Sequence, residues 1–259
     1  MAVTATATKS SRSKIIHILQ MERPQIVYIS PCKKNIFYMV KKKPPMEEFV
    51  RELADSLCNL KTSMPRIIIF CRRYMECAQM YQLFHHYLGK DFTEPSGISH
   101  GIAKCRLVDM YCKCTEPDVK EAIVRAFSLP NGNLRIVIAT IAFGMGLDCP
   151  DVRQVIHWGP SHDIESYVQE TGRGGRDEFL SCALLFYCDS DNRTSSPLMM
   201  EYCTLKTCRR TQLFQDFEES DVRVAACRPC MCCDECMVTC KCVSCNTGCS
   251  IKNAFHCVA

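Results

Sequence analysis

The stretch from Arg135 to Glu178, RIVIATIAFGMGLDCPDVRQVIHWGPSHDIESYVQETGRGGRDE, decides the fold class. Its apolar run at 136–139 is rich in β-branched residues, which is typical of a buried strand in a parallel α/β sheet. A glycine-interrupted loop over 140–146 follows, at the position where open α/β sheets bind ligands. A second strand is expected over 153–158. The pattern therefore predicts a parallel sheet with a ligand-binding loop.

A helix with a basic, glycine-rich end follows the second strand. Ser161 or Asp163 is expected to cap its start. Gln169, Arg173 and Arg176 share one helical face if the helix persists to residue 176. The glycines between the arginines let the backbone approach a ligand closely, and guanidinium groups bind phosphate oxygens bidentately. A basic surface turn is the alternative interpretation of GRGGR.

The segments AFGMGLDCPDVRQVIHW and SYVQETGRGGRDE together resemble motifs V and VI of RecQ-type superfamily 2 DNA helicases almost residue for residue. The resemblance implies that Arg173 and Arg176 act as arginine fingers toward the γ-phosphoryl group of ATP and that Gln169 senses the nucleotide state. It also implies nucleotide contacts from Gly146 and Asp148. Thr140 is implied to contact the phosphate backbone of single-stranded DNA.

Length and composition are those of an ordinary soluble globular protein. The 259 residues are 47% apolar and 23% charged, and they suffice for one large or two modest domains. The formal charge of +4 is small, and its positive excess lies in residues 1–66. No apolar run is long enough to cross a membrane, and the first residues lack a signal-peptide pattern. We therefore expect an intracellular protein without a membrane partner.

The first 45 residues resemble the end of a preceding lobe. Residues 3–9, VTATATK, resemble helicase motif III, although a meaningless leader is the alternative. KKKPP at 41–45 is expected to be an interlobe linker, since Pro-Pro continues neither a helix nor a sheet ladder. The chain contains no GxxxxGK[ST] loop and no Asp-Glu-x-His box. We therefore expect the end of a first lobe at 1–43, a second lobe at 44–190 and a cysteine-rich subdomain at 191–259.

Alternating helix and strand patterns predict an α/β fold with a RecA-like parallel sheet flanked by helices, followed by a small helical zinc-binding subdomain. Helices are expected at 46–60, 74–88, 117–127 and 198–217, and further strands at 25–29, 35–40, 66–71, 106–110 and 180–188. Arg72 and Arg73 occupy the family's motif IV but depart from its usual sequence, so their contact with nucleic acid is an open alternative. Cys112 and Cys114 are expected to serve packing.

Twelve of the 22 cysteines fall after residue 200, with CxxC spacings that indicate metal binding in a reducing compartment. Tetrahedral zinc takes four such ligands. The RecQ zinc-binding subdomain, in which Cys-Arg-Arg and Cys-x-x-Cys-Asp-x-Cys supply them, resembles this region and implies Cys208, Cys230, Cys233 and Cys236. Cys227 or Cys232 could replace Cys230. For the cysteines from Cys240 to Cys257, a second metal site and an unstructured end stay equally open.

The resemblance implies an ATP-dependent 3′-to-5′ DNA helicase active in DNA repair and recombination. Its cofactors would be Zn²⁺ and ATP with Mg²⁺, bound mainly by a lobe that this sequence lacks. Its partners would be single-stranded and duplex DNA, in the nucleus or, in a cell without one, the cytoplasm; the oligomeric state stays undetermined. Alternatives are a truncated, non-catalytic nucleic-acid-binding zinc protein and a metal-buffering protein.

Overall fold

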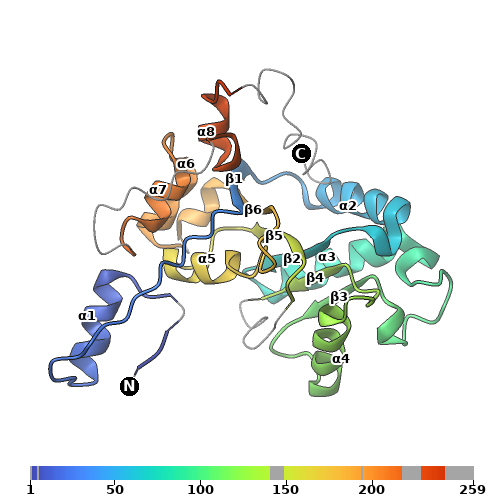
Figure 1. Cartoon of the computed structure of the whole chain (residues 1–259). Helices are drawn as coiled ribbons and strands as arrows, with labels where there is room; N and C mark the ends of the chain where they lie inside the picture. The colour runs from blue at the N-terminus through green and yellow to red at the C-terminus, as the bar shows by residue number, and fades with distance from the viewer. Residues whose placement is uncertain (1, 5, 141–148, 194, 218–228, 243–259) are drawn as a thin grey trace.

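The computed structural model describes residues 2–4, 6–140, 149–193, 195–217 and 229–242. Its centre is a six-stranded parallel sheet in the order β1-β6-β5-β2-β4-β3 (Figure 1). The strands are β1 (Ile36–Lys42), β2 (Arg66–Cys71), β3 (Val108–Tyr111), β4 (Ile136–Ala139), β5 (Val152–Trp158) and β6 (Ser181–Tyr187). The helices are α1 (Lys9–Ile18), α2 (Met46–Leu60), α3 (Tyr74–Leu88), α4 (Pro117–Ser128), α5 (Ile164–Thr171), α6 (Pro197–Thr204), α7 (Arg209–Phe214) and α8 (Asp234–Val238). The predicted parallel α/β sheet is confirmed.

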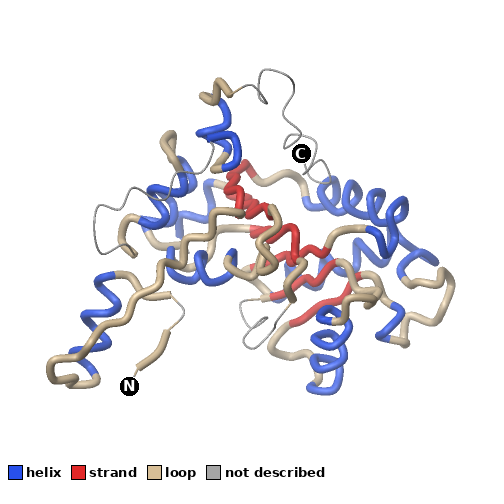
Figure 2. Tube along the Cα trace, in the orientation of Figure 1, coloured by secondary structure: helices blue, strands red, loops and turns tan. Residues whose placement is uncertain are grey.

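Helices α2 and α3 cover one face of the sheet. Phe49, Leu53 and Leu57 recur at helical spacing along α2 and are all buried. They join one core with Ile67 and Ile69, which are alternate residues of β2. Figure 2 shows the helices in blue on either side of the red strands. Both α2 and α3 have the bounds that the apolar periodicity predicts.

The opposite face carries α4 near β3 and helices α5, α6 and α7 near β1. Ile68 and Phe70 of β2 point to this face, because side chains alternate along a strand, and they share a core with Ile123 and Phe127 of α4. The α4 helix begins with Pro117 at its first turn, as the sequence predicts. The sheet is thus the middle of three layers.

Helices α6 and α7 share their core with the β1 end of the sheet. The Tyr202 ring of α6 lies 5.4 Å from the Tyr167 ring of α5, and the Phe214 ring of α7 lies 6.2 Å from the Tyr38 ring of β1. All four residues are buried in one cluster. The C-terminal helices therefore pack on the sheet rather than around a core of their own.

The edge strand β1 includes two residues that the sequence placed in a linker. Ile36–Lys42 pairs with Ser181–Tyr187 along its whole length, so residues 41 and 42 belong to the sheet rather than to a linker. Ile36, Phe37 and Tyr38 are buried, which explains why the chain joins the sheet here. Pro44 and Pro45 then end the strand, because proline cannot donate to the ladder.

Two other expectations were wrong. Residues 25–29 form no strand, and the single helix expected over 198–217 is instead the α6–α7 pair, because 205–208 between them is not helical. A helix that periodicity did not indicate, α1, begins after Thr8, whose hydroxyl accepts a hydrogen bond from the Ser11 amide at 3.2 Å. Among the described residues, no helix has the length and apolar character needed to span a membrane.

Candidate functional site

The GRGGR loop (Gly172–Arg176) lies at the amino ends of β5 and β6. Helix α5 begins at its cap Asp163 and ends at Thr171, so it does not persist to residue 176. The Gly175 amide donates to the Val152 carbonyl at 3.0 Å, which fixes the loop beside the first residue of β5. Gly175 has φ 55°, a left-handed conformation that glycine adopts at little cost. A Cβ there would lie 2.4 Å from the Asn35 side-chain nitrogen.

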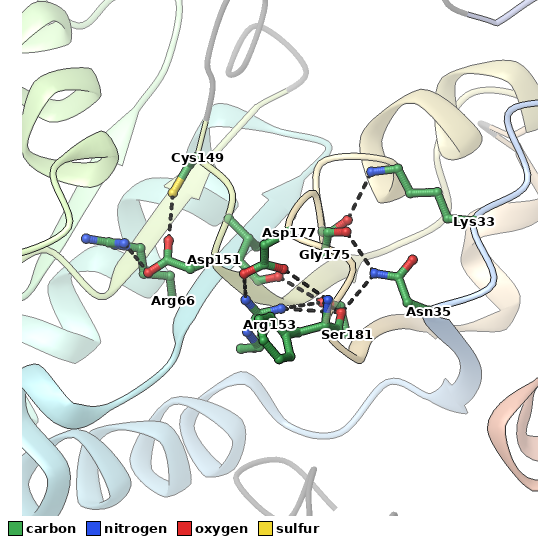
Figure 3. Close-up of polar contacts among 12 residues, drawn as sticks. Lys33, Asn35, Arg66, Cys149, Asp151, Arg153, Gly175, Asp177 and Ser181 are labelled. Atoms are coloured by element: carbon green, nitrogen blue, oxygen red, sulfur yellow. Dashed lines mark hydrogen bonds and ion pairs between the residues drawn. The ribbon is translucent and has the colours of Figure 1, made fainter.

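Two side chains from the segment before β1 hold this loop (Figure 3). The Lys33 ammonium donates to the carbonyls of Gly172 at 2.7 Å and Gly174 at 3.3 Å. The Asn35 amide donates to the carbonyls of Gly175 and Phe179, both at 2.8 Å. The backbone of the GRGGR loop is therefore fixed by residues 140 positions away in the chain.

An ion pair fixes the far side of the loop. The Arg153 guanidinium pairs with the Asp177 carboxylate and donates to the Ser181 hydroxyl at 3.2 Å. The Ser181 hydroxyl in turn donates to the Val152 carbonyl at 3.0 Å. Figure 3 shows these side chains converging beneath Gly175. The loop is thus tied to both strands that flank it.

The three predicted catalytic residues lie close together in the chain but differ in exposure. Gln169 and Arg176 are exposed, whereas only 8% of Arg173 is exposed. Burial lowers the pKa of Arg173, and the charge of Arg176 lowers it further, while Glu170 opposes both. Burial and Arg176 likewise lower the pKa of Lys33. Three cations therefore gather around the GRGGR loop, an arrangement that favours binding of an anion.

The predicted nucleic-acid residues lie at the carboxyl ends of the strands. Thr140 directly follows β4, and Arg72 and Arg73 directly follow the neighbouring strand β2, so all three are at carboxyl ends. Arg73 is exposed at the start of α3. Arg72 is half-buried and donates to the Ser195 hydroxyl at 2.8 Å. The Thr140 amide donates to the Tyr111 carbonyl at 3.3 Å.

Gly175 of the GRGGR loop and Thr140 thus lie at opposite ends of the parallel strands. β5 has seven residues, and at about 3.3 Å per residue its two ends are roughly 20 Å apart. Arg173 and Arg176 lie close enough for their charges to interact, whereas Gln169 adjoins Glu170, which contacts His157 near the carboxyl end of β5. Gly146 and Asp148, the predicted nucleotide contacts of the intervening loop, lie outside the described residues.

A buried polar cluster joins α5 to the strand beneath it. A ring nitrogen of His157 lies 2.9 Å from a Glu170 carboxylate oxygen, and the Ser161 hydroxyl donates to the same oxygen at 2.6 Å. All three side chains are buried. They line, with Arg72, a cavity of about 130 Å³ at the carboxyl end of β5. The cluster holds α5, which leads into the GRGGR loop, in register with β5.

Seven of the C-terminal cysteines that the structure describes form two clusters. The first cysteine cluster is Cys208, Cys232, Cys233 and Cys236, and the second is Cys230, Cys240 and Cys242; within each, the sulfur atoms lie within 4.8 Å of one another and could hold a metal ion. Cys208, Cys233 and Cys236 are brought together as expected. Cys230 is not with them, and Cys232 takes its place. The structure therefore favours the alternative that spacing alone left open.

Sulfur contacts shift the thiol pKa values in the first cysteine cluster in opposite directions, since the pKa of Cys236 is raised by burial and by its contacts with Cys233 and Cys208, whereas that of Cys208 is lowered. The sulfur atoms of Cys208 and Cys232 are 3.6 Å apart, and hydrogen bonds from Cys232 and Cys233 hold the pKa of the Cys208 thiol well below its usual value. The Cys236 amide donates to the Cys233 sulfur at 3.5 Å. A thiolate is the metal-binding form of cysteine. The cluster therefore has the donor set of a tetrahedral site for a soft or borderline cation.

The knuckle segment (residues 229–242) is attached to the outer edge of β1. The Tyr38 amide donates to the Cys232 carbonyl at 3.2 Å, and the Val40 amide donates to the Asp234 carboxylate at 3.0 Å. Asp234 also accepts from the Arg209 guanidinium, which donates to the Tyr202 carbonyl at 3.0 Å. Arg209 therefore links the knuckle segment, α6 and α7.

Four features escaped prediction from sequence. Lys33 and Asn35 gave no signal because their contacts are distant in the chain, and the His157–Glu170 pair gave none because neither spacing nor composition marks it. The second cysteine cluster was left open because cysteine spacings alone do not assign ligands to separate ions. Of the three cations around the GRGGR loop, the sequence predicted Arg173 and Arg176 but not Lys33.

Comparison with known proteins identifies the family. The helicase conserved C-terminal domain matches residues 48–178. ATP-dependent DNA helicase Q-like 2 of Arabidopsis thaliana is 31% identical over 234 residues, which are 85% of this chain and 30% of that protein. ATP-dependent DNA helicase RecQ of Pasteurella multocida is 30% identical over 264 residues, covering 92% of this chain and 36% of that protein. The chain therefore belongs to the helicase conserved C-terminal domain family.

Within that family the chain is RecQ-like, as its motifs predicted. It spans about a third of the length of these relatives. The structure of Saccharomyces cerevisiae Dbp5 L327V bound to RNA and ADP BeF3 has a TM-score of 0.56 over 83% of this chain and 49% of that chain, at 15% identity. This likeness identifies the fold alone and confirms the predicted RecA-like sheet.

Proposed function

We propose that this chain is the nucleotide-sensing and strand-gripping C-terminal region of an ATP-dependent, 3′-to-5′ DNA helicase of RecQ type. The observation that carries the proposal is the gathering of Lys33, Arg173 and Arg176 around the GRGGR loop of a sheet that also carries Arg72 and Arg73 at the carboxyl end of β2. A nucleotide bound at the GRGGR loop and a DNA strand bound at the carboxyl ends of the β-strands would be coupled through α5 and β5. The named relatives are DNA helicases, which supports DNA as the nucleic acid.

The GRGGR loop supports a role in phosphoryl transfer. The charge of Arg176 repels those of Arg173 and Lys33, and a bound polyanion would relieve that repulsion. Guanidinium groups that stabilise charge on a transferred γ-phosphoryl group raise the rate by roughly 10³–10⁵-fold. The exposed Arg176 would reach the phosphate, and the buried Arg173 would act from the wall of the site. The exposed Gln169, in the last turn of α5, would respond to the presence of the γ-phosphate. Gly146 and Asp148 would contact the nucleotide.

The principal ATP- and Mg²⁺-binding residues are not part of this chain. It contains neither a GxxxxGK[ST] loop nor an Asp-Glu-x-His box. Loops of the first kind cradle phosphates through backbone amides. The arginine fingers would therefore act on ATP held by a second RecA-like lobe. We propose that residues 2–35 belong with that lobe or its connection, and that residues 36–190 form the lobe that carries the fingers.

The carboxyl ends of β2 and β4 are the proposed DNA site. Thr140 would contact the phosphate backbone of single-stranded DNA, and Arg72 and Arg73 supply two cations from the adjacent strand end. Contacts of this kind are independent of base sequence and weaken with salt. Closure of the nucleotide cleft against the GRGGR loop would shift these carboxyl ends relative to the other lobe and so move the bound DNA strand.

The first cysteine cluster is proposed to bind structural Zn²⁺. Four thiolates satisfy tetrahedral zinc, and such sites contribute about 10 kcal/mol or more of apparent binding energy to folding. Because the knuckle segment contacts β1, this ion would fix the edge strand as well as the tail. In a eukaryotic cell the protein would act in the nucleus, in DNA repair and recombination.

A chimera tests the proposal. The corresponding region of a RecQ helicase is replaced by this chain, and DNA-stimulated ATP hydrolysis and unwinding of a 3′-tailed duplex are measured. We expect both activities, and we expect Arg176→Ala to reduce hydrolysis by roughly 10³-fold or more while DNA binding is retained. Lys34→Ala is the matched control, since Lys34 contributes only its backbone carbonyl to a described contact. Equal hydrolysis in the Arg176→Ala chimera would refute the finger assignment.

A non-enzymatic, nucleic-acid-binding zinc protein is the second candidate. The cysteine clusters and the cations Arg72 and Arg73 are compatible with it. Salt-sensitive DNA binding by the chain, combined with no hydrolysis in the chimera, would support it over the helicase.

A further inference from the structure

The second cysteine cluster lies apart from the site proposed for the structural zinc. Cys230 is buried in a 3₁₀ turn over Pro229–Met231, while Cys240 and Cys242 follow α8. None of its three sulfur atoms belongs to the first cysteine cluster. The proposed helicase function does not use these residues.

Local backbone structure brings the three cysteines together. After α8 ends at Val238, the Thr239 hydroxyl donates to the Cys236 carbonyl at 3.1 Å and the Cys240 amide donates to the Met237 carbonyl at 3.3 Å. These bonds turn the chain back toward the 3₁₀ turn that precedes α8. Cys240 and Cys242 then approach Cys230 from the other side of the helix, although ten or more residues separate them in the chain.

The sulfur spacing fits a metal ion better than a disulfide. The sulfur atoms of Cys230 and Cys242 are 3.7 Å apart, whereas a disulfide bond is about 2.05 Å long. A Zn–S distance of about 2.3 Å in tetrahedral geometry places two sulfur ligands roughly 3.8 Å apart. The Cys208–Cys232 pair of the first cysteine cluster has nearly the same separation, 3.6 Å. The two clusters thus share the sulfur spacing of thiolate ligands on one cation.

We propose that Cys230, Cys240 and Cys242 bind a second soft divalent cation, Zn²⁺ in the cell, independently of the first. Three thiolates occupy three tetrahedral positions, and water or another ligand takes the fourth. Binding releases the thiol protons, since the thiolate is the ligand. This assignment also explains why Cys230 is not in the first cysteine cluster: Cys230 and Cys232, which have one residue between them, serve different ions. The second ion would close the knuckle segment behind α8.

Native mass spectrometry of the full chain, purified with zinc and dialysed against metal-free buffer, tests the proposal. We expect two zinc ions per wild-type chain, one in Cys242→Ser, and two in Cys114→Ser. Cys114 is the matched control, because it is exposed and belongs to neither cluster. One ion in the wild type, or two in Cys242→Ser, would overturn the proposal.

A titration of the wild-type apoprotein with Co²⁺ keeps the test decisive if a variant does not fold. Thiolate-to-cobalt charge-transfer absorption rises with the number of bound sulfurs. We expect two saturating equivalents, the weaker adding about three-quarters of the absorbance of the stronger because it has three thiolates rather than four. Saturation at one equivalent would overturn the second site, whereas the helicase proposal would be unaffected.

Discussion

Replacing Gly175 with alanine should destabilise the chain more than replacing its neighbour Gly174. At Gly175 the new Cβ would lie 2.4 Å from the Asn35 nitrogen and 2.7 Å from the Ser181 hydroxyl. The left-handed backbone costs an L-residue about 1–2 kcal/mol. Displacing Asn35 forfeits two hydrogen bonds worth about 1 kcal/mol each. At Gly174 the nearest atoms lie at 3.4 Å, an ordinary contact.

The expected cost of Gly175→Ala is therefore about 3–4 kcal/mol, a fall in Tm of roughly 6–16 °C for a chain of this size. Thermal unfolding followed by circular dichroism measures it, with Gly174→Ala as the control. In an Asn35→Ala background the cost should fall by about 2 kcal/mol, because the two Asn35 hydrogen bonds are already absent. Equal Tm values for the two alanine variants would refute the account of how the GRGGR loop is held.

Three further outcomes are expected. The purified 259-residue chain should hydrolyse no ATP alone, and DNA-stimulated hydrolysis that disappears in Arg176→Ala would contradict this. Zinc chelation should make the region after Leu198 protease-sensitive while α2 to β6 stay resistant; an unchanged digestion pattern would contradict the first cysteine cluster as a metal site. Burial would raise the pKa of Asp163, but hydrogen bonds from Ser166 and His162 outweigh it and lower the pKa below 3.8. The stabilisation that ionised Asp163 gives α5 is thus present above pH 3.8 and is lost as the pH falls through the folded-state value. Urea titrations at a series of pH values would measure the free energy of unfolding of the wild type and of Asp163→Ala. The wild type should be more stable by about 1 kcal/mol above pH 3.8, and this difference should disappear at lower pH. A difference that does not change with pH would exclude the charged cap.

Local patterns predicted the elements that local forces determine. The bounds of α2, α3, β2 and β4 follow from apolar periodicity and from prolines and glycines that interrupt it. A strand at 35–40 was predicted, but its pairing with β6 was not, because that pairing joins residues far apart in the chain. A run of lysines before Pro-Pro suggested a linker, yet the buried residues Ile36 to Tyr38 draw the strand into the sheet.

The candidate site divides along the same line. The sequence predicts Arg173, Arg176 and three of the four first-cluster cysteines, since their types and spacings are specific to phosphate and zinc chemistry. It does not predict Lys33, because a lysine that serves backbone carbonyls resembles any surface lysine. Cys230 and Cys232 are chemically identical, so the fold of the knuckle segment decides between them.

The attachment of the knuckle segment to β1 has a consequence for the handling of this protein. An edge strand with unpaired amides can pair with another molecule and nucleate aggregation. Cys232 and Asp234 occupy the amides of Tyr38 and Val40, and therefore block that edge. A chain stripped of metal would expose an apolar strand ready for intermolecular pairing. Metal supply during expression would then determine whether the protein stays monodisperse or forms β-rich assemblies.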